Sequence, residues 1–379
     1  MPFKKAGQYS LHLFLFLLTL FTTTLAGGEW ATGKLFFFNR EGFISTGTFS
    51  AADWRLGLMF SLSFLGVLTV HEFGHYFTAR FYKIRVTLPY YIPMFFFITS
   101  SIGTMGAFIK IKDRIFSRKE FFDVGVAGPL AGLAVALPLL FYGYTHLPDP
   151  EYIFRIHPEY QQFGLDYAQH VYQNSEGQLY LGKNLLILFF ENFVADPNLL
   201  PPKYELIHYP FLLAGYLSLI FTALNLLPVG QLDGGHVLYG LLGYERFNRV
   251  APVIFVLFIG YAGLGIITPQ TDWSDPYSLR LLYILYLPLV FQKIVPRFSQ
   301  ALTLAFGVLV FQFAFSFVFP NAEGYHGWLV FGLILSRALG VHHPPCPDER
   351  PLSAGRKVLG WLALLFFVLC FSPTPFVVE

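Results

Sequence analysis

The sequence predicts an all-α polytopic membrane protein, a multi-helix bundle that carries a small membrane-associated β hairpin or sheet. Of its 379 residues, 55% are hydrophobic and 13% are charged, whereas soluble domains carry about 25% charged residues. Long apolar stretches recur from one end of the chain to the other. The formal net charge of +2 and the two cysteines argue against nucleic-acid binding and against a disulfide framework. We therefore expect contact with the lipid bilayer and no nucleic-acid partner.

Nine apolar segments are predicted to cross the membrane, which takes roughly 17 to 25 residues for about 30 Å of hydrocarbon. They are residues 11–26, 56–79, 121–144, 209–229, 250–267, 279–295, 301–319, 324–341 and 358–371. The first segment follows Lys4 and Lys5 and precedes a run of small residues, so it also has the pattern of a cleaved signal peptide.

The charges of the connecting loops predict the orientation, because Lys and Arg gather on the cytoplasmic side of a membrane. Eight of them lie between the second and third segments: Arg80, Lys83, Arg85, Lys110, Lys112, Arg114, Arg118 and Lys119. The 146–208 loop is instead mostly acidic among its charged residues. The N-terminus and the active-site side are therefore predicted to be cytoplasmic, in an integral multi-pass protein of the cytoplasmic membrane if the chain is bacterial.

The second apolar segment contains His71-Glu72-Phe73-Gly74-His75, a match to the H-E-x-x-H pattern. Its two imidazoles lie one helical turn apart on one face, which is the spacing that grips a single zinc ion, and Glu72 is placed to act as a general base. Ionisable residues inside a membrane span are costly unless they serve a site. Three of them in five positions of an apolar helix therefore indicate a metal site.

A catalytic zinc ion takes three protein ligands and leaves its fourth position open, so a third donor is needed. The best candidate is Asp233, which follows Pro228 and precedes two glycines at the foot of the fourth segment. Pro228 ends the regular helix, and glycines permit a tight turn that directs a short carboxylate back into the bundle. Asp233 could also cap the following helix. His236 is a rival donor, although we expect it near the ligands or at the helix start.

With these residues in hand, the chain resembles the site-2 proteases, zinc metalloproteases that cut their substrates within the membrane. The resemblance rests on His71 to His75, on Gly103 to Ile109, on Ala127 to Gly132 and on the Asn225 to Gly235 stretch, with a weaker echo at His343-Pro344-Pro345. It implies that His71, His75 and Asp233 bind one zinc ion per chain. Glu72 is then the base, and Asn225 helps to hold the substrate backbone or the developing oxyanion.

The 146–208 loop is short and lacks a Gly-Leu-Gly-Phe-like signature, so the chain resembles the branch of the family without PDZ domains, which includes chloroplast homologues. The implied organisation has three parts. Residues 1–55 form the first transmembrane segment and an outer loop, residues 56–240 the catalytic core, and residues 241–379 accessory transmembrane segments.

Residues 84–113 are rich in aromatic, β-branched and Gly or Pro residues, and apolar and Lys residues alternate from Phe108 to Lys112. This period of two predicts a hairpin or a sheet at the membrane edge. In the family such a sheet resembles a docking edge for an unwound substrate; an interfacial lid is the alternative. Gly128 and Gly132 form a G-x-x-x-G face that favours close helix packing. The donors His342, His343 and Cys346 lie in a proline-rich loop without the spacing of a metal site.

The function that the resemblance implies is hydrolysis of a peptide bond within or near the transmembrane segment of a single-span membrane protein. A catalytically inactive zinc-binding scaffold or a transporter is the alternative from another class. A di-iron desaturase needs further histidine boxes that we do not find, and a prenyl-protein protease normally takes a Glu as third ligand. The oligomeric state cannot be predicted from the sequence.

Overall fold

The structure is a computed structural model that describes residues 2–39, 42–95, 101–173, 177–271, 274 and 279–379. The chain forms two compact units. The first unit comprises Met1–Arg114, Ala127–Leu224 and Val368–Glu379, and the second comprises Ile115–Val126 and Asn225–Phe367. These units follow packing rather than function, so the three functional regions stay a prediction.

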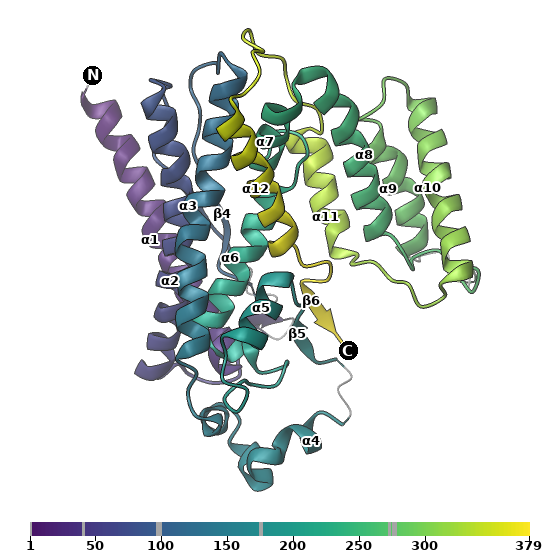
Figure 1. Ribbon diagram of the computed structural model, residues 1–379. Helices are drawn as coiled ribbons and strands as arrows, with labels where there is room; N and C mark the ends of the chain where they lie inside the picture. The colour runs from purple at the N-terminus through teal and green to yellow at the C-terminus, as the bar shows by residue number, and fades with distance from the viewer. Residues whose placement is uncertain (1, 40–41, 96–100, 174–176, 272–273, 275–278) are drawn as a thin grey trace. The chain divides into compact units, whose positions relative to one another are not determined.

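Four helices form the body of the first unit. They are α1 (Pro2–Thr32), α2 (Ala51–Phe81), α3 (Arg118–Thr145) and α6 (Pro210–Leu226), and the first residues of α3 and the last of α6 belong to the second unit. Within the first unit, α1, α2 and α3 lie side by side, and α6 runs in the same direction as α2 (Figure 1). Shorter elements connect α3 to α6: η1 (Pro150–Arg155), η2 (Pro158–Asp166), α4 (Tyr167–Val171), β5 (Leu179–Leu181), α5 (Leu185–Phe193) and η3 (Leu206–His208).

Helix α2 begins where a capping box satisfies its first backbone amides. The Ser50 hydroxyl accepts a hydrogen bond from the Asp53 amide at 3.3 Å, and the Ser50 amide donates to the Asp53 carboxylate at 2.7 Å. Lys34 pairs with the same carboxylate at 2.6 Å. Farther along, α1 and α2 approach closely because Gly57 faces the Thr24 carbonyl, where a Cβ atom would overlap it.

The described strands form three two-stranded antiparallel sheets. The pairs are β1 (Phe36–Asn39) with β2 (Gly42–Ser45), β3 (Tyr90–Pro93) with β4 (Thr104–Phe108), and β5 with β6 (Phe376–Val378). The hairpin predicted for residues 84–113 is confirmed as β3 and β4, with Tyr90 opposite Phe108 and a further bridge between Val86 and Ile111. Its tip, residues 96–100, lies outside the described residues.

The second unit is helical in its described part. Its helices are α7 (Asp233–Leu242), α8 (Tyr244–Ala262), α9 (Leu279–Phe291), α10 (Phe298–Val318), α11 (Gly327–Ile334) with the π-helical turn η4 (Leu335–Leu339), and most of α12 (Ala354–Cys370). Helix α9 packs against α10, and α8 packs against α7 and α11. Arg356 of α12 forms a bidentate ion pair with Asp123, both bonds measuring 2.8 Å.

Each of the nine predicted apolar segments overlaps a described helix in the sequence. By length and composition, four of the described helices could cross a membrane: Gly7–Thr32, Ala51–Phe81, Arg118–Thr145 and Phe298–Val318. Three apolar helices are shorter: Pro210–Leu226, Leu279–Phe291 and Gly327–Leu339. The predicted polytopic helical membrane fold is therefore confirmed.

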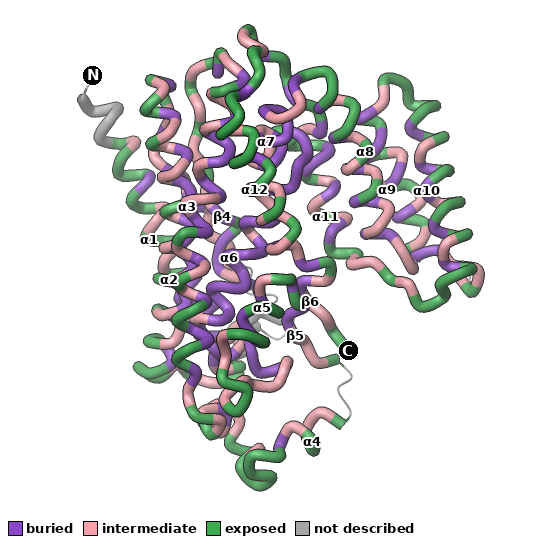
Figure 2. The backbone as a smooth tube through the Cα atoms, viewed as in Figure 1, coloured by how far each residue is buried: buried purple, intermediate pink, exposed green. Residues whose placement is uncertain are grey.

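The surface of helix α10 is suited to contact with lipid rather than with water. Its exposed positions include Phe306 and Phe317, at 69% and 73%, whereas Gln312 and Ser316 are buried on its inner side. Figure 2 shows the exposed side running along the length of this helix. Large apolar side chains outside and polar ones inside are expected for a helix whose surroundings are hydrocarbon.

Candidate metal centre

The two histidines of the predicted motif face each other inside the first unit. His71 and His75 lie one turn apart on α2 and are 5% and 7% exposed. Their Nε2 atoms are 3.1 Å apart. Two imidazole nitrogens bound to one tetrahedral zinc ion at about 2.0–2.1 Å lie about 3.3 Å from each other. The pair therefore fits a zinc ion held by both Nε2 atoms.

Helix α3 packs directly on these imidazoles through its glycines. A Cβ atom at Gly128 would overlap the ring of His75, and one at Gly132 would lie 3.3 Å from His71 Cβ. On the other helix, a Cβ atom at Gly74 would lie only 2.7 Å from the Ala127 carbonyl oxygen. The predicted G-x-x-x-G face is thus a packing face. Its glycines leave space for the two candidate zinc ligands.

Glu72 is buried as deeply as the histidines, with 4% of its surface exposed. A carboxylate in an apolar helix carries a large desolvation cost unless a cation or hydrogen bonds compensate it. Its place beside His71 puts it on the neighbouring face of α2, about 100° around the helix. This burial suits a proton acceptor that works in a site shielded from bulk water.

The β3–β4 hairpin lies against the α2 turns that precede the motif. Tyr91 of β3 packs with Leu65 and Leu68, and its hydroxyl is 2.8 Å from the Thr69 hydroxyl. The hairpin also contacts α1, where the Thr22 hydroxyl donates to the Gly103 carbonyl at 2.7 Å. The hairpin is therefore fixed beside the candidate site by both helices.

Asp233 belongs to the second unit and is the first residue of α7. Helix α6 ends at Leu226, and the chain turns through Gly230, whose φ of +62° suits glycine. The N-cap of α7 is Leu232, without a side-chain hydrogen bond, so Asp233 does not occupy the capping position that the alternative interpretation gave it. The predicted break and tight turn before Asp233 are present.

The glycines after Asp233 are required by close backbone contacts within this turn. A Cβ atom at Gly234 would overlap the Leu226 carbonyl, and one at Gly235 would lie 2.7 Å from the Val229 carbonyl oxygen. Asn225, the remaining predicted site residue, is the penultimate residue of α6 and is partly buried.

Sequence reasoning did not foresee the partner of His236, which is His343. His236 Nδ1 lies 2.9 Å from His343 Nε2, and His343 Nδ1 lies 2.7 Å from the Pro344 carbonyl. Because a carbonyl only accepts, His343 carries its proton on Nδ1 and accepts from His236 through Nε2. Burial lowers the pKa of His343 to about 4, so it is neutral at pH 7. His236 is thereby held by the hydrogen bond that it donates to the loop containing His343-Pro344-Pro345.

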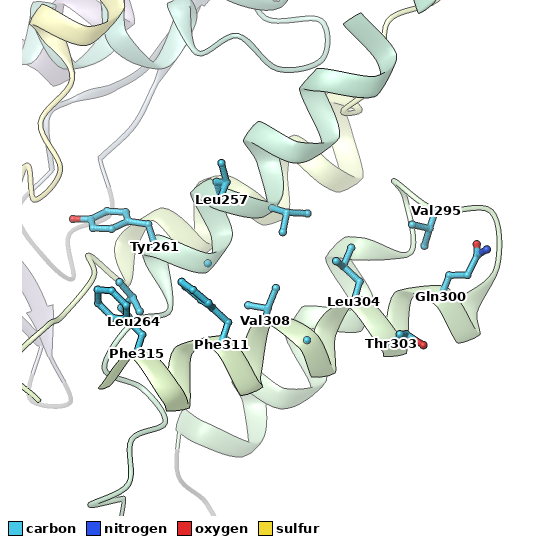
Figure 3. A pocket seen from close by; sticks show the side chains of 13 residues that line it. Leu257, Tyr261, Leu264, Val295, Gln300, Thr303, Leu304, Val308, Phe311 and Phe315 are labelled. Atoms are coloured by element: carbon cyan, nitrogen blue, oxygen red, sulfur yellow. The ribbon is translucent and has the colours of Figure 1, made fainter. Parts of the chain in front are cut away.

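A cavity of about 750 Å³ lies between α8 and α10 in the second unit. Figure 3 shows side chains of both helices, among them Leu257, Tyr261 and Phe311, around it. Its lining offers no metal ligand of the His, Cys, Asp or Glu type, and its only titratable side chain is that of Tyr261. It is therefore not a candidate hydrolytic site.

Comparison with known proteins agrees with the chemistry of these residues. The profile of peptidase family M50 matches residues 59–265, which is more than half of the chain and includes the His71 to His75 motif, Asn225 and Asp233. The chain belongs to peptidase family M50. This is the site-2 protease family, so the resemblance drawn from the sequence is confirmed, and the family is one of membrane zinc metalloproteases.

Curated relatives are similar over most of this chain. The probable chloroplastic zinc metalloprotease EGY1 of Oryza sativa subsp. japonica is 29% identical over 73% of this chain and 44% of its own length. EGY1 of Arabidopsis thaliana is 28% identical over 73% of this chain and 46% of its own length. The probable chloroplastic zinc metalloprotease EGY2 of Oryza sativa subsp. indica is 28% identical over 55% of this chain and 33% of its own length.

The chain spans less than half the length of these curated relatives. No solved structure matches.

Proposed function

We propose that the chain is an intramembrane zinc metalloprotease that hydrolyses a peptide bond within or near a transmembrane segment of a membrane protein. The observation that carries this proposal is the buried pair of His71 and His75, whose Nε2 atoms face each other inside an apolar helix. Membership of peptidase family M50 supports the reaction class. Cleavage of this kind is regulated intramembrane proteolysis, with a single-span protein as substrate.

We assign one zinc ion to His71, His75 and Asp233. Two neutral imidazoles and one carboxylate are donors that zinc accepts, and a set of three leaves the fourth position open. A bound zinc ion supplies Lewis-acid polarisation of the scissile carbonyl and lowers the pKa of the attacking water. With Glu72 and Asp233 both ionised, the charge of the ion is balanced, which lowers the cost of the cluster in a membrane.

The protein side chains then carry the proton and hold the substrate. Glu72 takes the proton from the attacking water on its carboxylate and gives it to the departing amine. The Asn225 amide donates a hydrogen bond to the substrate backbone or to the oxygen that becomes negative during attack. The deep burial of Glu72 excludes bulk water from this proton transfer.

The substrate must unwind, because the peptide bonds of a membrane helix are satisfied within the helix and shielded by its side chains. We propose that β4 offers its free edge to the unwound segment as an added strand. Two of its five residues, Met105 and Phe108, are 57% and 47% exposed, which supports access to this strand. Substrate spans with Gly, Pro or Asn should therefore be cut better than regular ones.

The experiment that tests the proposal is cleavage in liposomes of two single-span substrates, one with an all-Leu span and one with a Gly-Pro pair in it. We expect the second to be cut faster. Chelator treatment should abolish cleavage, and zinc, but not magnesium, should restore it. A protein that holds zinc at the His71–His75 pair and cuts neither substrate would instead be a zinc-binding scaffold or transporter.

We further propose that the connection between α2 and α3 faces the cytoplasm, as its Lys and Arg residues indicate. Lys112 in this connection and Gln169 in the loop between α3 and α6 are both exposed, and both native cysteines are buried. In intact cells, a membrane-impermeant maleimide should label Gln169→Cys and should reach Lys112→Cys only after lysis. The reverse pattern would overturn the orientation.

A further inference from the structure

A second group of metal-ligating side chains lies in the loop between α3 and α6, within the first unit. His157, Glu205 and His208 each bring one donor atom to within 4.8 Å of the other two. His157 precedes η2, whereas Glu205 and His208 lie at η3, so the chain brings them together from distant positions. Glu205 is 1% exposed and His208 is 6% exposed. None of the three belongs to the zinc centre proposed above.

The hydrogen bonds of the two imidazoles direct their lone pairs toward each other. His208 Nδ1 lies 2.9 Å from the Trp30 carbonyl, and His157 Nδ1 lies 3.1 Å from the Glu159 carboxylate. Both partners are acceptors, so each ring carries a proton on Nδ1. In the neutral form each Nε2 atom then carries a lone pair and no proton. These two atoms are 3.3 Å apart. Two lone pairs at this distance repel unless a cation lies between them.

Glu205 supplies the negative charge that such a cation needs. Its Oε1 accepts a hydrogen bond from the Tyr172 hydroxyl. Its Oε2 is buried without a hydrogen-bond partner and lies 3.6 Å from His208 Nε2. A buried carboxylate oxygen with no partner is costly, so its place in a native site calls for an explanation. A metal ion bound to Oε2 would supply the missing partner.

We propose that His157, Glu205 and His208 form a second zinc site in this loop. The separation of the two Nε2 atoms equals the value of about 3.3 Å that two nitrogens adopt on one tetrahedral zinc ion. Imidazole nitrogen is a ligand for zinc, whereas calcium and magnesium take oxygen ligands. Glu159, Trp30 and Tyr172 bond the outer atoms of the three ligands, as the surroundings of protein metal sites do.

The site joins segments that are far apart along the chain. Zinc would connect the start of η2 to η3, and the Trp30 carbonyl would connect both to the end of α1. His208 is also held through its carbonyl, which accepts from the Tyr152 hydroxyl at 3.0 Å. Because closing a long loop lowers the entropy of the unfolded chain, a metal cross-link of this kind stabilises the folded loop. We assign the site a structural role.

Metal analysis of the full chain in detergent tests the proposal. We expect two zinc ions per chain in the wild type after equilibration with zinc. Glu205→Gln and the double variant His157→Asn/His208→Asn should each hold one, and so should His71→Asn/His75→Asn. Combining the two double variants should remove all zinc. If the wild type holds one zinc ion that only the His71 and His75 substitutions remove, the second site is overturned and the proposed active centre stands.

A milder substitution keeps the test valid if the ligand variants fail to fold. Glu159 is exposed and its carboxylate bonds the outer nitrogen of His157, so Glu159→Gln leaves all three donors in place. We expect it to weaken zinc binding at this site by about 10- to 100-fold in the His71→Asn/His75→Asn background.

Matched controls in the same loop are Glu151→Gln and His170→Asn, both at exposed positions. Neither should change the affinity. The affinity is read from titration with Co²⁺, whose visible absorption reports tetrahedral binding. An absence of tetrahedral cobalt in this background would mean that the two imidazoles share a proton instead of a metal ion. Unchanged cobalt binding in Glu159→Gln would mean that the metal is bound elsewhere, and either result overturns the site.

Discussion

Glu72→Gln should lower the rate of peptide hydrolysis by about 10²- to 10⁴-fold, the range that a positioned general base contributes. Glutamine fills almost the same volume and keeps one carbonyl oxygen, but it cannot take a proton at neutral pH. The loss should fall on kcat, because Glu72 acts in the proton transfer and not in substrate binding. Zinc at the His71–His75 pair should be retained, since glutamine leaves both imidazoles in place.

The measurement is cleavage of the Gly-Pro substrate by each variant at equal zinc content. Glu245→Gln is the matched control, because Glu245 is 82% exposed in its side chain and pairs only with Arg249 on the surface of α8. It should cut as the wild type does. If Glu72→Gln retained full activity with zinc bound, another group would be the base and the mechanism proposed here would be wrong.

The sequence predicts those parts of this protein that depend on residues close together in the chain. The apolar runs place the helices, and the spacing of His71 and His75 places their rings on one face of α2, because the helical period fixes both. The break at Pro228 and the glycines after Asp233 likewise predict the turn before α7, since proline and glycine act on the backbone at their own positions.

What the sequence could not predict depends on contacts between distant segments. Nothing local to Gly128 indicates that its missing side chain makes room for the His75 ring. His157 and His208 lie in a loop with no metal-binding spacing between them, and His236 of α7 contacts His343 of a distant loop. Such pairs follow from the tertiary fold, and a single sequence carries no signal of them beyond the presence of the residue types.

Gly128→Ala should remove zinc from the His71–His75 pair and lower cleavage by about 10²-fold or more, since a catalytic group displaced by about 1 Å costs that much. The added methyl group would overlap the His75 imidazole, so the ring cannot keep its place. Alanine is the better helix former by about 1 kcal/mol, so α3 itself gains stability from the change. The loss would therefore come from the displaced ligand and not from an unfolded helix.

Gly132→Ala, one turn farther along α3, gives the graded control for this prediction. Its methyl group would lie 3.3 Å from His71 Cβ and 3.4 Å from His71 Nδ1, close contacts that a shift of a few tenths of an ångström relieves. This variant should keep its zinc and lose activity only slightly. Zinc content and cleavage are measured for both variants beside circular dichroism of the purified proteins. Equal behaviour of the two, with zinc retained in Gly128→Ala, would show that the His75 ring does not lie against Gly128, and the ligand arrangement would have to be redrawn.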